Sequence, residues 1–585
     1  MNRSIFGIET LSKAGTSSAG TVVGPGDRVT GRAFAGRSVV RAPSGMAACS
    51  QPLAAQSAVD VLRRGGHAVD AAIAANSVSA VTEPMSCGLG GDLFALVWIE
   101  KEKRLYGLNG SGRAPAFLDA DTLADRGLKA VPATGPLSVT VPGVVDGWWE
   151  LHRRFGTLPW SELFDQAADY AEQGFPVSDL AAHHWQEWGP RVSSEPGFAA
   201  YWLPDGRPPR AGERRRDPAL ARTYRRLAAD GRDAFYEGEP AERMVRALAE
   251  AGAPWTRADF SYHTSSWVEP LSVSYRGHDI WQLPPNGQGL AVLQMLNILE
   301  GFDLRRLGLG SADLLHLQIE AKKLAFEDRA RFYADPDFFD APVEGLLSAE
   351  YAATRRSLID PRRAAEALGA GTPAAGTPER RPPAADPSLL DQGDTVCIVT
   401  ADGEGNMVSL MQSLFLPFGS GVTVPELGFV LQNRGALFAA DPAHPNVAAP
   451  GKRPFHTIIP SFVSRDGEAE AAFGVMGGAA QPQGELQVLV HLLDFGLGLQ
   501  EAGDAPRWLH QGSSQPTGRP ADGGGTVYLE SGFHPETRRG LVERGHRVAH
   551  TVGLFGGYQA VARDRSNQVY VGASEHRQDG QATGF

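Results

Sequence analysis

A chain of 585 residues, 42% hydrophobic and 21% charged, has the composition of a soluble globular protein and enough length for more than one core. Its net charge of −12 and pI near 5.7 argue against a nucleic-acid partner, because no concentrated stripe of Lys and Arg offsets them. The basic run at residues 212–218 is interpreted as a solvated loop.

Cys49, Cys87 and Cys397 form neither a disulfide framework nor a CxxC metal site, so we expect small buried hydrophobes. The N-terminus lacks the sustained apolar run of a signal peptide, and no stretch of 18 apolar residues predicts a membrane span. These features predict a cytoplasmic enzyme with no nucleic-acid and no membrane partner.

Residues 1–36 are rich in Gly, Ser and Thr and are expected to be loosely ordered. The sequence from residue 38 predicts a strand and then two Ala-rich helices separated at Gly65-Gly66, with Ser50 as the N-cap of the first helix. A Gly-rich turn, "EPMSCGLGGD", then leads into a strand, and "KEKRLYGLNG" supplies the return strand of a hairpin.

The stretch 130–350 is expected to be largely helical, because several segments carry apolar residues at three-to-four spacing. Residues 361–394 have too few large apolar side chains to build a core and are interpreted as a linker. From Thr395 the pattern turns to strands, with helices predicted at about 481–496 and 535–545. No internal repeat is visible, and the layout is of the α/β class.

The segment "TVCIVTADGEGNMVSLMQSLF" starts at Thr395 and predicts a β-hairpin, because two apolar runs flank the turn residues "ADGEGN". A turn centred on Glu404 makes Thr400 face Val408 and Thr395 face Ser413. Opposed residues of an antiparallel pair have Cβ atoms about 5 Å apart. This register places a second hydroxyl beside Thr395.

A threonine hydroxyl is a weak nucleophile until a base removes its proton. At a free N-terminus Thr395 would carry its own base, an α-amine with a pKa of about 7.7–8.0. A flexible linker that ends just before Thr395 is suited to cleavage of the Asp394-Thr395 bond. The alternative is that Thr395 simply begins a strand, where β-branched residues are favoured.

Gly477-Gly478 lies between a predicted strand and a predicted helix. Paired glycines let backbone N–H groups approach a ligand, and the helix N-terminus favours negative charge, as an oxyanion hole requires. A plain Gly-rich turn is the alternative. Arg113, in "GSGRAP", is of the residue type that binds a carboxylate through two parallel hydrogen bonds, or it forms a surface salt bridge.

From residue 38 to the C-terminus the chain resembles the γ-glutamyltransferase family of N-terminal nucleophile hydrolases. The matching stretches are "SQPLAAQSAVDVLRRGGHAVDAAIAA", "EPMSCGLGGDLFAL", "LNGSGRAP", "SVTVPGVVDGW", "LQMLNILEGFDL", "GDTVCIVTADGEGNMVSLMQSLFLPFGSG", "GKRPFHTIIPSFV", "GVMGGAAQPQ", "DAPRW" and "GASEHRQDGQATGF". The fold implied by this resemblance is a four-layer αββα sandwich, which suits strands that are apolar on both faces.

The resemblance further implies self-cleavage between Asp394 and Thr395. The products would be a large subunit, residues 1–394 (globular part 36–360, linker 361–394), and a small catalytic subunit, residues 395–585. It assigns the oxyanion hole to Gly477 and Gly478, carboxylate binding to Arg113, and a hydrogen bond with the nucleophile to Ser413. Association of two large–small pairs into a dimer of heterodimers is left open.

Five positions depart from the transpeptidase pattern. Phe415 replaces an Asn, and Leu437 replaces the Asp that holds the α-amine of a γ-glutamyl group. His456-Thr457 replaces a carboxylate-binding Ser-Ser pair, and Arg434 stands where the family has Glu or Gln. Because Leu437 cannot hold an ammonium and Arg434 and His456 could make the pocket more cationic, the pattern resembles a side branch that includes glutaryl-type acylases and oxamate amidohydrolase.

Other motifs give weaker evidence for a functional site. His316 and Glu320 are four residues apart on a predicted helix, but without a third ligand or an HExxH pattern they are interpreted as packed polar groups and not a metal site. His183-His184 is interpreted as a chance pair on a helix face. The "GLGGD" turn lacks GxGxxG spacing, and the chain has no GxSxG, which excludes a dinucleotide site and the nucleophile elbow of α/β-hydrolases.

The resulting hypothesis is an amidohydrolase or acyltransferase that forms an acyl-enzyme on Thr395, needs no cofactor, and passes the acyl group to water or an amine acceptor. The substrate is a small amide bearing a carboxylate. The first hypothesis is a γ-glutamyl amide such as glutathione, and the second is an acyl group without an α-amine. An uncleaved, inactive binding protein is the third.

Overall fold

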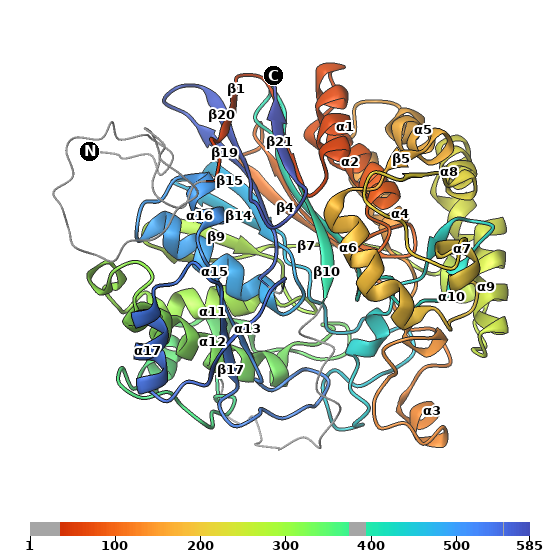
Figure 1. Cartoon of the computed structure of the whole chain (residues 1–585). Helices are drawn as coiled ribbons and strands as arrows, with labels where there is room; N and C mark the ends of the chain where they lie inside the picture. Colours follow the sequence, from red (N-terminus) through yellow and green to blue (C-terminus); the bar gives the residue numbers. More distant parts are fainter. Residues whose placement is uncertain (1–35, 374–392, 554) are drawn as a thin grey trace.

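The structure is a computed structural model of the chain, and it describes residues 36–373, 393–553 and 555–585. Two seven-stranded sheets stack face to face and form the centre of the molecule (Figure 1). In spatial order the first sheet contains β21 (Gln581–Gly584), β2 (Met46–Cys49), β10 (Asp394–Ala401), β11 (Met407–Phe415), β3 (Asp92–Ile99), β4 (Arg104–Gly110) and β7 (Ser266–Val268). The second contains β1 (Val40–Ala42), β20 (Val569–Ser574), β19 (Tyr558–Asp564), β15 (Glu468–Val475), β14 (Ser461–Arg465), β9 (His278–Gln282) and β8 (Leu271–Tyr275).

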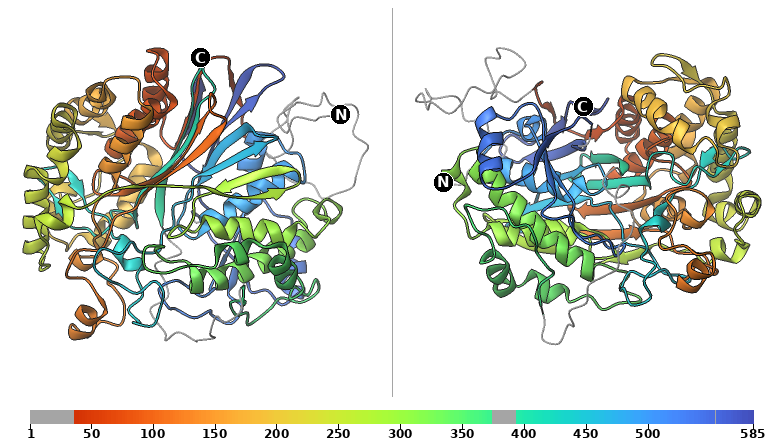
Figure 2. Two further views of the ribbon diagram at one scale, coloured as in Figure 1. Left: turned by 180° about the vertical axis from the view of Figure 1, so that it is seen from behind. Right: turned by 60° about the horizontal axis from the view of Figure 1, so that its bottom comes forward.

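Helices cover the outer face of each sheet, so the layers run αββα, as the family resemblance implied (Figures 1 and 2). Outside the first sheet lie α1 (Pro52–Arg63), α2 (Ala68–Thr82), α4 (Val144–Phe155), α5 (Asp165–Gln173), α6 (Asp179–Trp188), α8 (Pro218–Tyr236) and α9 (Glu239–Glu250). Outside the second lie α11 (Gly289–Leu299), α12 (Ala312–Phe332), α14 (Ala349–Arg356), α15 (Ala480–Leu493), α16 (Leu499–Asp504) and α17 (Pro535–Glu543).

Short elements complete the described chain. The short helices are α3 (Ala120–Asp125), α7 (Phe198–Trp202), α10 (Arg257–Ser261) and α13 (Val343–Leu347). Three small sheets pair β5 (Phe175–Pro176) with β6 (Arg214–Arg215), β12 (Thr423–Val424) with β13 (Phe429–Val430), and β16 (Trp508–Gln511) with β17 (Thr526–Leu529) and β18 (Val548–His550). In the part of the chain that the structure describes, no helix has the length and apolarity to cross a bilayer.

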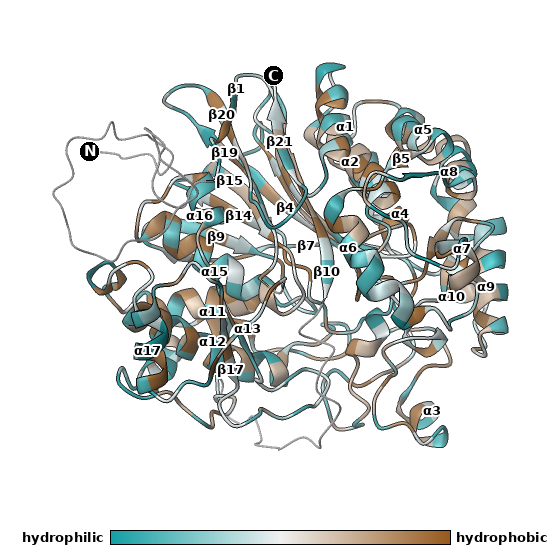
Figure 3. Cartoon of the chain, viewed as in Figure 1, coloured by the Kyte–Doolittle hydropathy of each residue, from teal (hydrophilic) through white to brown (hydrophobic). Residues whose placement is uncertain are grey.

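The strand sequences explain the stacking, because both faces of the central strands are buried. In β10, Val396 and Ile398 pack into the core beneath α2, whereas Cys397 and Val399 pack between the two sheets. Outer helices are amphipathic: α9 buries Ala241, Met244 and Leu248 on one face, and hydrophilic residues colour its other face teal in Figure 3. The core is therefore three apolar layers between four layers of secondary structure.

Both sheets contain strands from each of the two proposed subunits. In the first sheet, β10 and β11 lie between β2 and β3, and β21 from the C-terminus closes the edge beside β2. In the second sheet, β1 lies at one edge and β9 and β8 at the other, with β14, β15, β19 and β20 between them. Neither sheet can be completed by residues 1–394 or by residues 395–585 alone.

The predicted elements agree with the structure in most places. The two Ala-rich helices and the 83–110 hairpin are present, and the helices predicted at 481–496 and 535–545 are α15 and α17. The N-cap of α1 is Gln51 and not Ser50, because the Gln51 side chain accepts the Leu53 N–H at 2.6 Å while Ser50 bonds elsewhere. Strands β7 to β9 were not predicted within the largely helical stretch.

The linker prediction falls partly outside the described residues, since 374–392 are not described. Residues 361–373 contain no helix or strand, in agreement with the prediction, and Ala364 N–H donates to Arg544 O at 2.7 Å. The chain re-enters the described structure at Gly393, one residue before β10.

Candidate active site

Thr395 lies buried at the start of β10, with 3% of its surface exposed. Its hydroxyl donates to the carbonyl oxygen of Asp394 at 2.7 Å, which is the carbonyl of the bond preceding it. Gln481 Nε2, from the first turn of α15, donates to the same hydroxyl oxygen at 3.2 Å. The hydroxyl is thus fixed beside the Asp394-Thr395 peptide bond by two hydrogen bonds.

The hairpin register is as predicted from Val396 to Ala401, with Thr400 opposite Val408. It shifts between Asp394 and Val396, so that Asp394 pairs with Phe415 and Thr395 does not pair directly with Ser413. This bulge changes the expected contact: the Ser413 hydroxyl donates to Asp394 O at 2.6 Å instead of bonding the Thr395 hydroxyl. Two hydroxyl groups therefore converge on one carbonyl oxygen.

Gly477 and Gly478 connect β15 to α15, and both have left-handed backbones with φ of 112° and 57°. A Cβ on Gly393 would lie 2.8 Å from Gly478 Cα, so the chain just before Asp394 passes directly over the glycine pair. Gln288 Nε2 donates to Gly478 O at 2.9 Å and to Thr457 O at 2.7 Å. The glycine pair, the Asp394 carbonyl and Thr457 are consequently neighbours.

A buried ionic cluster centres on Asp92, at the start of β3. Arg434 Nη2 lies 3.4 Å from Asp92 Oδ1, and His456 Nε2 lies 3.0 Å from Asp92 Oδ2. Arg434 Nη1 also donates to Thr457 Oγ1 at 2.8 Å, and its guanidinium lies 5.0 Å from the centre of the Phe415 ring. Because Phe415 pairs with Asp394, this cluster adjoins the candidate nucleophile.

Burial sets the charge states of this cluster. Burial and the nearby Arg434 lower the pKa of His456 to about 4, so its imidazole is neutral at pH 7. Burial lowers the pKa of Arg434 to about 10, which leaves the guanidinium charged. Burial would raise the pKa of Asp92, but His456 and Arg434 outweigh it and lower the pKa. The cluster therefore holds one cation, Arg434, and one anion, Asp92, and the neutral His456 adds no charge to it.

Two apolar side chains stand where a transpeptidase would have polar ones. Leu437 is fully buried and belongs to the same core cluster as Phe415. Phe415 has a left-handed backbone with φ of 80°, and its N–H donates to Ser413 Oγ at 2.7 Å. Neither side chain can accept a hydrogen bond from an ammonium group.

Arg113 has acidic partners of its own. Its Nη2 donates to Asp337 Oδ2 at 3.0 Å and its Nη1 to Gly451 O at 2.9 Å, and 24% of the side chain is exposed. The preceding residue contacts the buried ionic cluster, because the Gly112 N–H donates to Asp92 Oδ2 at 3.4 Å. Arg113 therefore lies beside the candidate site, in a salt bridge with Asp337.

The structure adds four residues that the sequence did not single out: Asp92, Gln288, Gln481 and Ser86. Asp92 follows the "GLGG" turn and begins a strand that is otherwise apolar. A single polar residue at the start of such a strand could have indicated a site residue. Gln288 and Gln481 each follow a Gly-containing turn at a helix start. Ser86 donates to the Asp394 carboxylate at 2.6 Å.

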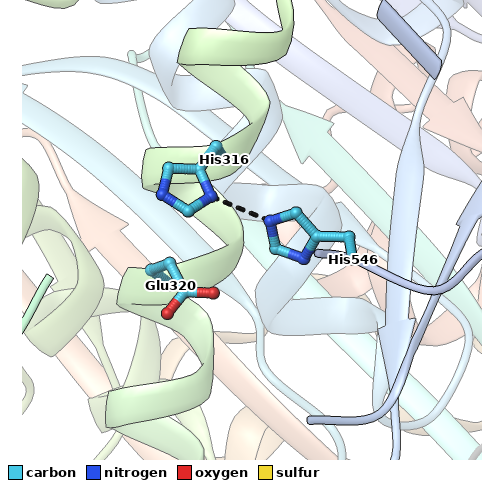
Figure 4. A group of neighbouring side chains, drawn as sticks. All are labelled: His316, Glu320 and His546. Atoms are coloured by element: carbon cyan, nitrogen blue, oxygen red, sulfur yellow. Dashed lines mark hydrogen bonds between the residues drawn. The ribbon is translucent and has the colours of Figure 1, made fainter. Parts of the chain in front are cut away.

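A separate cluster provides the third potential metal ligand that the sequence did not reveal. His316, Glu320 and His546 bring their donor atoms within 4.8 Å of one another (Figure 4). Each is already engaged: His316 Nδ1 bonds His546 Nε2 at 2.8 Å, and Glu320 pairs with Lys323 at 2.8 Å. The Lys323 ammonium would repel a cation there, so these contacts favour packed polar groups.

The fold and the placement of Thr395 at the start of a central strand define the class of N-terminal nucleophile hydrolases. The family model for γ-glutamyltranspeptidase matches residues 54–585, and the chain belongs to that family. Among similar curated proteins are a glutathione hydrolase-like proenzyme of Bacillus subtilis, 36% identical over 539 residues (91% of this chain, 97% of that protein), and the oxamate amidohydrolase proenzyme of Klebsiella pneumoniae, 35% identical over 550 residues (92% and 98%).

A solved structure is similar over nearly the whole chain. The cephalosporin acylase from Bacillus halodurans matches with a TM-score of 0.85 and 40% identity, over 96% of this chain and 99% of that one. These comparisons identify the protein as an enzyme of the amidohydrolase and acyltransferase kind, related to proenzymes.

Proposed function

We propose that the chain cuts itself between Asp394 and Thr395 and then acts as an amidohydrolase through the new N-terminal threonine. The observation that carries this proposal is the pair of hydroxyl groups, from Thr395 and Ser413, on the Asp394 carbonyl oxygen. A hydrogen-bond donor on that oxygen would stabilise the negative charge that develops when the Thr395 hydroxyl attacks the carbonyl carbon. Cleavage would separate residues 1–394 from residues 395–585.

In the second stage the free α-amine of Thr395 removes the proton of its own hydroxyl, which attacks the carbonyl carbon of a substrate amide. Backbone N–H groups at Gly477 and Gly478 stabilise the oxyanion, and the leaving amine takes the proton. Gln481 holds the hydroxyl oxygen in place. Water or an acceptor amine then releases the acyl group from Thr395.

The substrate proposed is an amide whose acyl group carries a carboxylate and no α-amine. The buried, apolar Leu437 and Phe415 support the absence of an ammonium site. Asp92, the acid of the buried ionic cluster, is engaged by Arg434 and His456 and leaves little capacity for an ammonium. Arg113, whose side chain is 24% exposed, can bind a carboxylate in place of Asp337. Arg434 is fully buried and bonded to Asp92 and Thr457, so it holds the site together.

A γ-glutamyl amide such as glutathione is the second candidate. It is supported by relatives that are named glutathione hydrolase, whereas Arg113 suits the carboxylate of either candidate. The two candidates differ in one group, the α-amine of the donor.

Two measurements test this function. Denaturing electrophoresis and N-terminal sequencing should give two chains, the smaller beginning at Thr395, and Thr395→Ala should remain a single chain. A single band from the unaltered protein would instead indicate an uncleaved binding protein.

For the substrate, turnover of γ-glutamyl anilide, glutaryl anilide and oxamate should be compared at equal enzyme concentration. Glutaryl anilide differs from the γ-glutamyl compound only in the α-amine and is the matched control. Activity confined to the γ-glutamyl compound would overturn the preferred substrate class.

A further inference from the structure

The carboxylate of Asp394 contacts the nitrogen of the bond that we propose is cut. Asp394 Oδ1 accepts the Thr395 backbone N–H at 2.8 Å. Its other oxygen, Oδ2, accepts the hydroxyl proton of Ser86 at 2.6 Å and lies 3.7 Å from His184 Nδ1. The side chain is thus folded back onto its own peptide bond and held there by residues more than 200 positions away.

Ser86 is itself fixed to the strand that carries Ser413. The Ser86 carbonyl accepts the Leu414 N–H at 3.1 Å, within the β-bulge that turns Ser413 toward Asp394 O. The Ser86 N–H donates to Glu83 O at 2.9 Å at the end of α2. One short loop, residues 83–86, therefore positions both the carboxylate beside the nitrogen and the donor beside the carbonyl oxygen.

Cleavage of an amide by a neighbouring hydroxyl requires two proton movements. The attacking hydroxyl must lose its proton, and the departing nitrogen must gain one, because an amide anion is a very poor leaving group. The Ser413 donor serves the oxygen and supplies neither movement. A carboxylate at the nitrogen can perform both in turn.

We propose that the Asp394 carboxylate carries the hydroxyl proton of Thr395 to the Thr395 nitrogen during self-cleavage, and that Ser86 positions it. The proposal rests on the proposed self-cleavage and deepens it. The bond from Thr395 Oγ1 to the Asp394 carbonyl carbon forms as the hydroxyl proton passes to Asp394 Oδ1. The carbon–nitrogen bond then breaks, and the same proton moves to the nitrogen, which leaves as an α-amine.

This acyl shift needs no other reactant. The Asp394 carboxylate is regenerated, and the Thr395 hydroxyl oxygen is left as an ester of the Asp394 carbonyl. Water hydrolyses this ester, adding hydroxide to the Asp394 carbonyl carbon and a proton to Thr395 Oγ1. Asp394 then ends the large subunit and is no longer bonded to the nucleophile. Its carboxylate is required once in the life of each molecule.

The test follows self-cleavage of the full chain during cell-free synthesis, sampled over time on denaturing gels. Asp394→Asn keeps the size and polarity but cannot carry the proton, and we expect cleavage to slow by about 100-fold or more. Asp394→Glu keeps the carboxylate and should restore most of the rate. Asp466→Asn, the same change in an exposed turn, is the control.

Ser86 is tested by Ser86→Ala, expected to slow cleavage about tenfold through loss of one hydrogen bond. Ser86→Thr, which retains a hydroxyl, should rescue it. Ser79→Ala, within α2, is the matched control because the Ser79 hydroxyl bonds only its own helix backbone at Ala75 O among the described contacts.

Cleavage of Asp394→Asn at the unaltered rate would overturn the proposal, and so would Asp394→Glu as slow as Asp394→Asn. Failure of the unaltered chain to be cut at Thr395 would overturn the proposed function itself, so the two failures are distinguishable. Small subunit released slowly from Asp394→Asn should turn over substrate at the normal rate per molecule. Reduced turnover would place Asp394 in the mature site and contradict the single use.

Discussion

The hydroxyl of Ser413 and the carbonyl of Asp394 are joined by a 2.6 Å hydrogen bond across the bulge of the β10–β11 hairpin. The bond depends on the register shift, since a regular ladder would have turned Ser413 toward Thr395. It places a donor on the one oxygen that must become negative if Thr395 attacks.

Removal of the Ser413 hydroxyl should slow self-cleavage. We expect Ser413→Ala to lower the rate by about 100-fold, the usual effect of losing one oxyanion donor, and Ser413→Thr to retain most of it. The measurement is the fraction of cut chain against time on denaturing gels. Ser409→Ala is the control, because Ser409 lies on the same strand and donates to Phe473 O. Equal rates for Ser413→Ala and Ser409→Ala would contradict the role.

Gln481 should influence the nucleophile through its amide nitrogen alone. Gln481→Glu keeps the oxygen that accepts the Ile459 N–H at 3.0 Å and loses the donor to Thr395. We expect turnover of the mature enzyme to fall about tenfold, as for the loss of one hydrogen bond. Gln483→Glu places the same charge in the same helix, where the side chain bonds Ala479 O and His510 O. A similar loss in both variants would refute the specific contact.

The buried ionic cluster should be sensitive to removal of its acid. Asp92→Asn leaves Arg434 buried with its charge unmatched, and we expect a loss of about 3–5 kcal/mol in the free energy of unfolding. Urea unfolding of the uncut Thr395→Ala chain measures this on a single polypeptide. Asp337→Asn, which removes the half-exposed partner of Arg113, should cost less than about 1 kcal/mol. A loss below 1 kcal/mol for Asp92→Asn would show that the pair contributes little.

Glu83 should make stability depend on pH. Burial, opposed by the Ser50 hydroxyl and reinforced by Asp394 and Asp579, raises the pKa of Glu83 to about 8 from its ordinary 4.5. The folded state therefore holds this proton more tightly, so the stabilisation is full below about pH 4.5 and is lost as pH rises through 8.

In the uncut Thr395→Ala chain, Glu83→Gln should remove this dependence. Its stability relative to the Glu83 chain should increase between pH 5 and pH 8 by an amount on the order of a few kcal/mol. Urea unfolding at both pH values measures the difference, with exposed Glu404→Gln as the control. A difference that does not change with pH would contradict the raised pKa.

The β10–β11 hairpin was predictable because it depends on local pattern, whereas the four-layer fold was expected only from the family resemblance. Apolar residues on both faces of a strand indicate a buried sheet, and the turn residues around Glu404 set a register that holds from Val396 to Ala401. Helix α15 likewise follows from its apolar sequence and the preceding glycines.

The contacts that decide the chemistry were not predictable in this way. Asp92 and Arg434 are 342 residues apart in the chain and meet only when β3 lies beside β11. The bulge at Ser413 is a local irregularity that no turn rule specifies, and it alone redirects the hydroxyl from Thr395 to Asp394. Strands β7 to β9 are short and half-buried, so their pattern is weak within a helical region.

Because each sheet is built from strands of both residues 1–394 and residues 395–585, folding has to precede cleavage. The two pieces can interleave easily only while they are still one polypeptide, when closing each sheet is an intramolecular event. Once cut, an unfolded molecule would have to reassemble from two chains, at a rate that depends on concentration. A cleaved enzyme that is unfolded in dilute solution should therefore lose activity irreversibly. The uncut Thr395→Ala chain should regain its fold when the denaturant is removed.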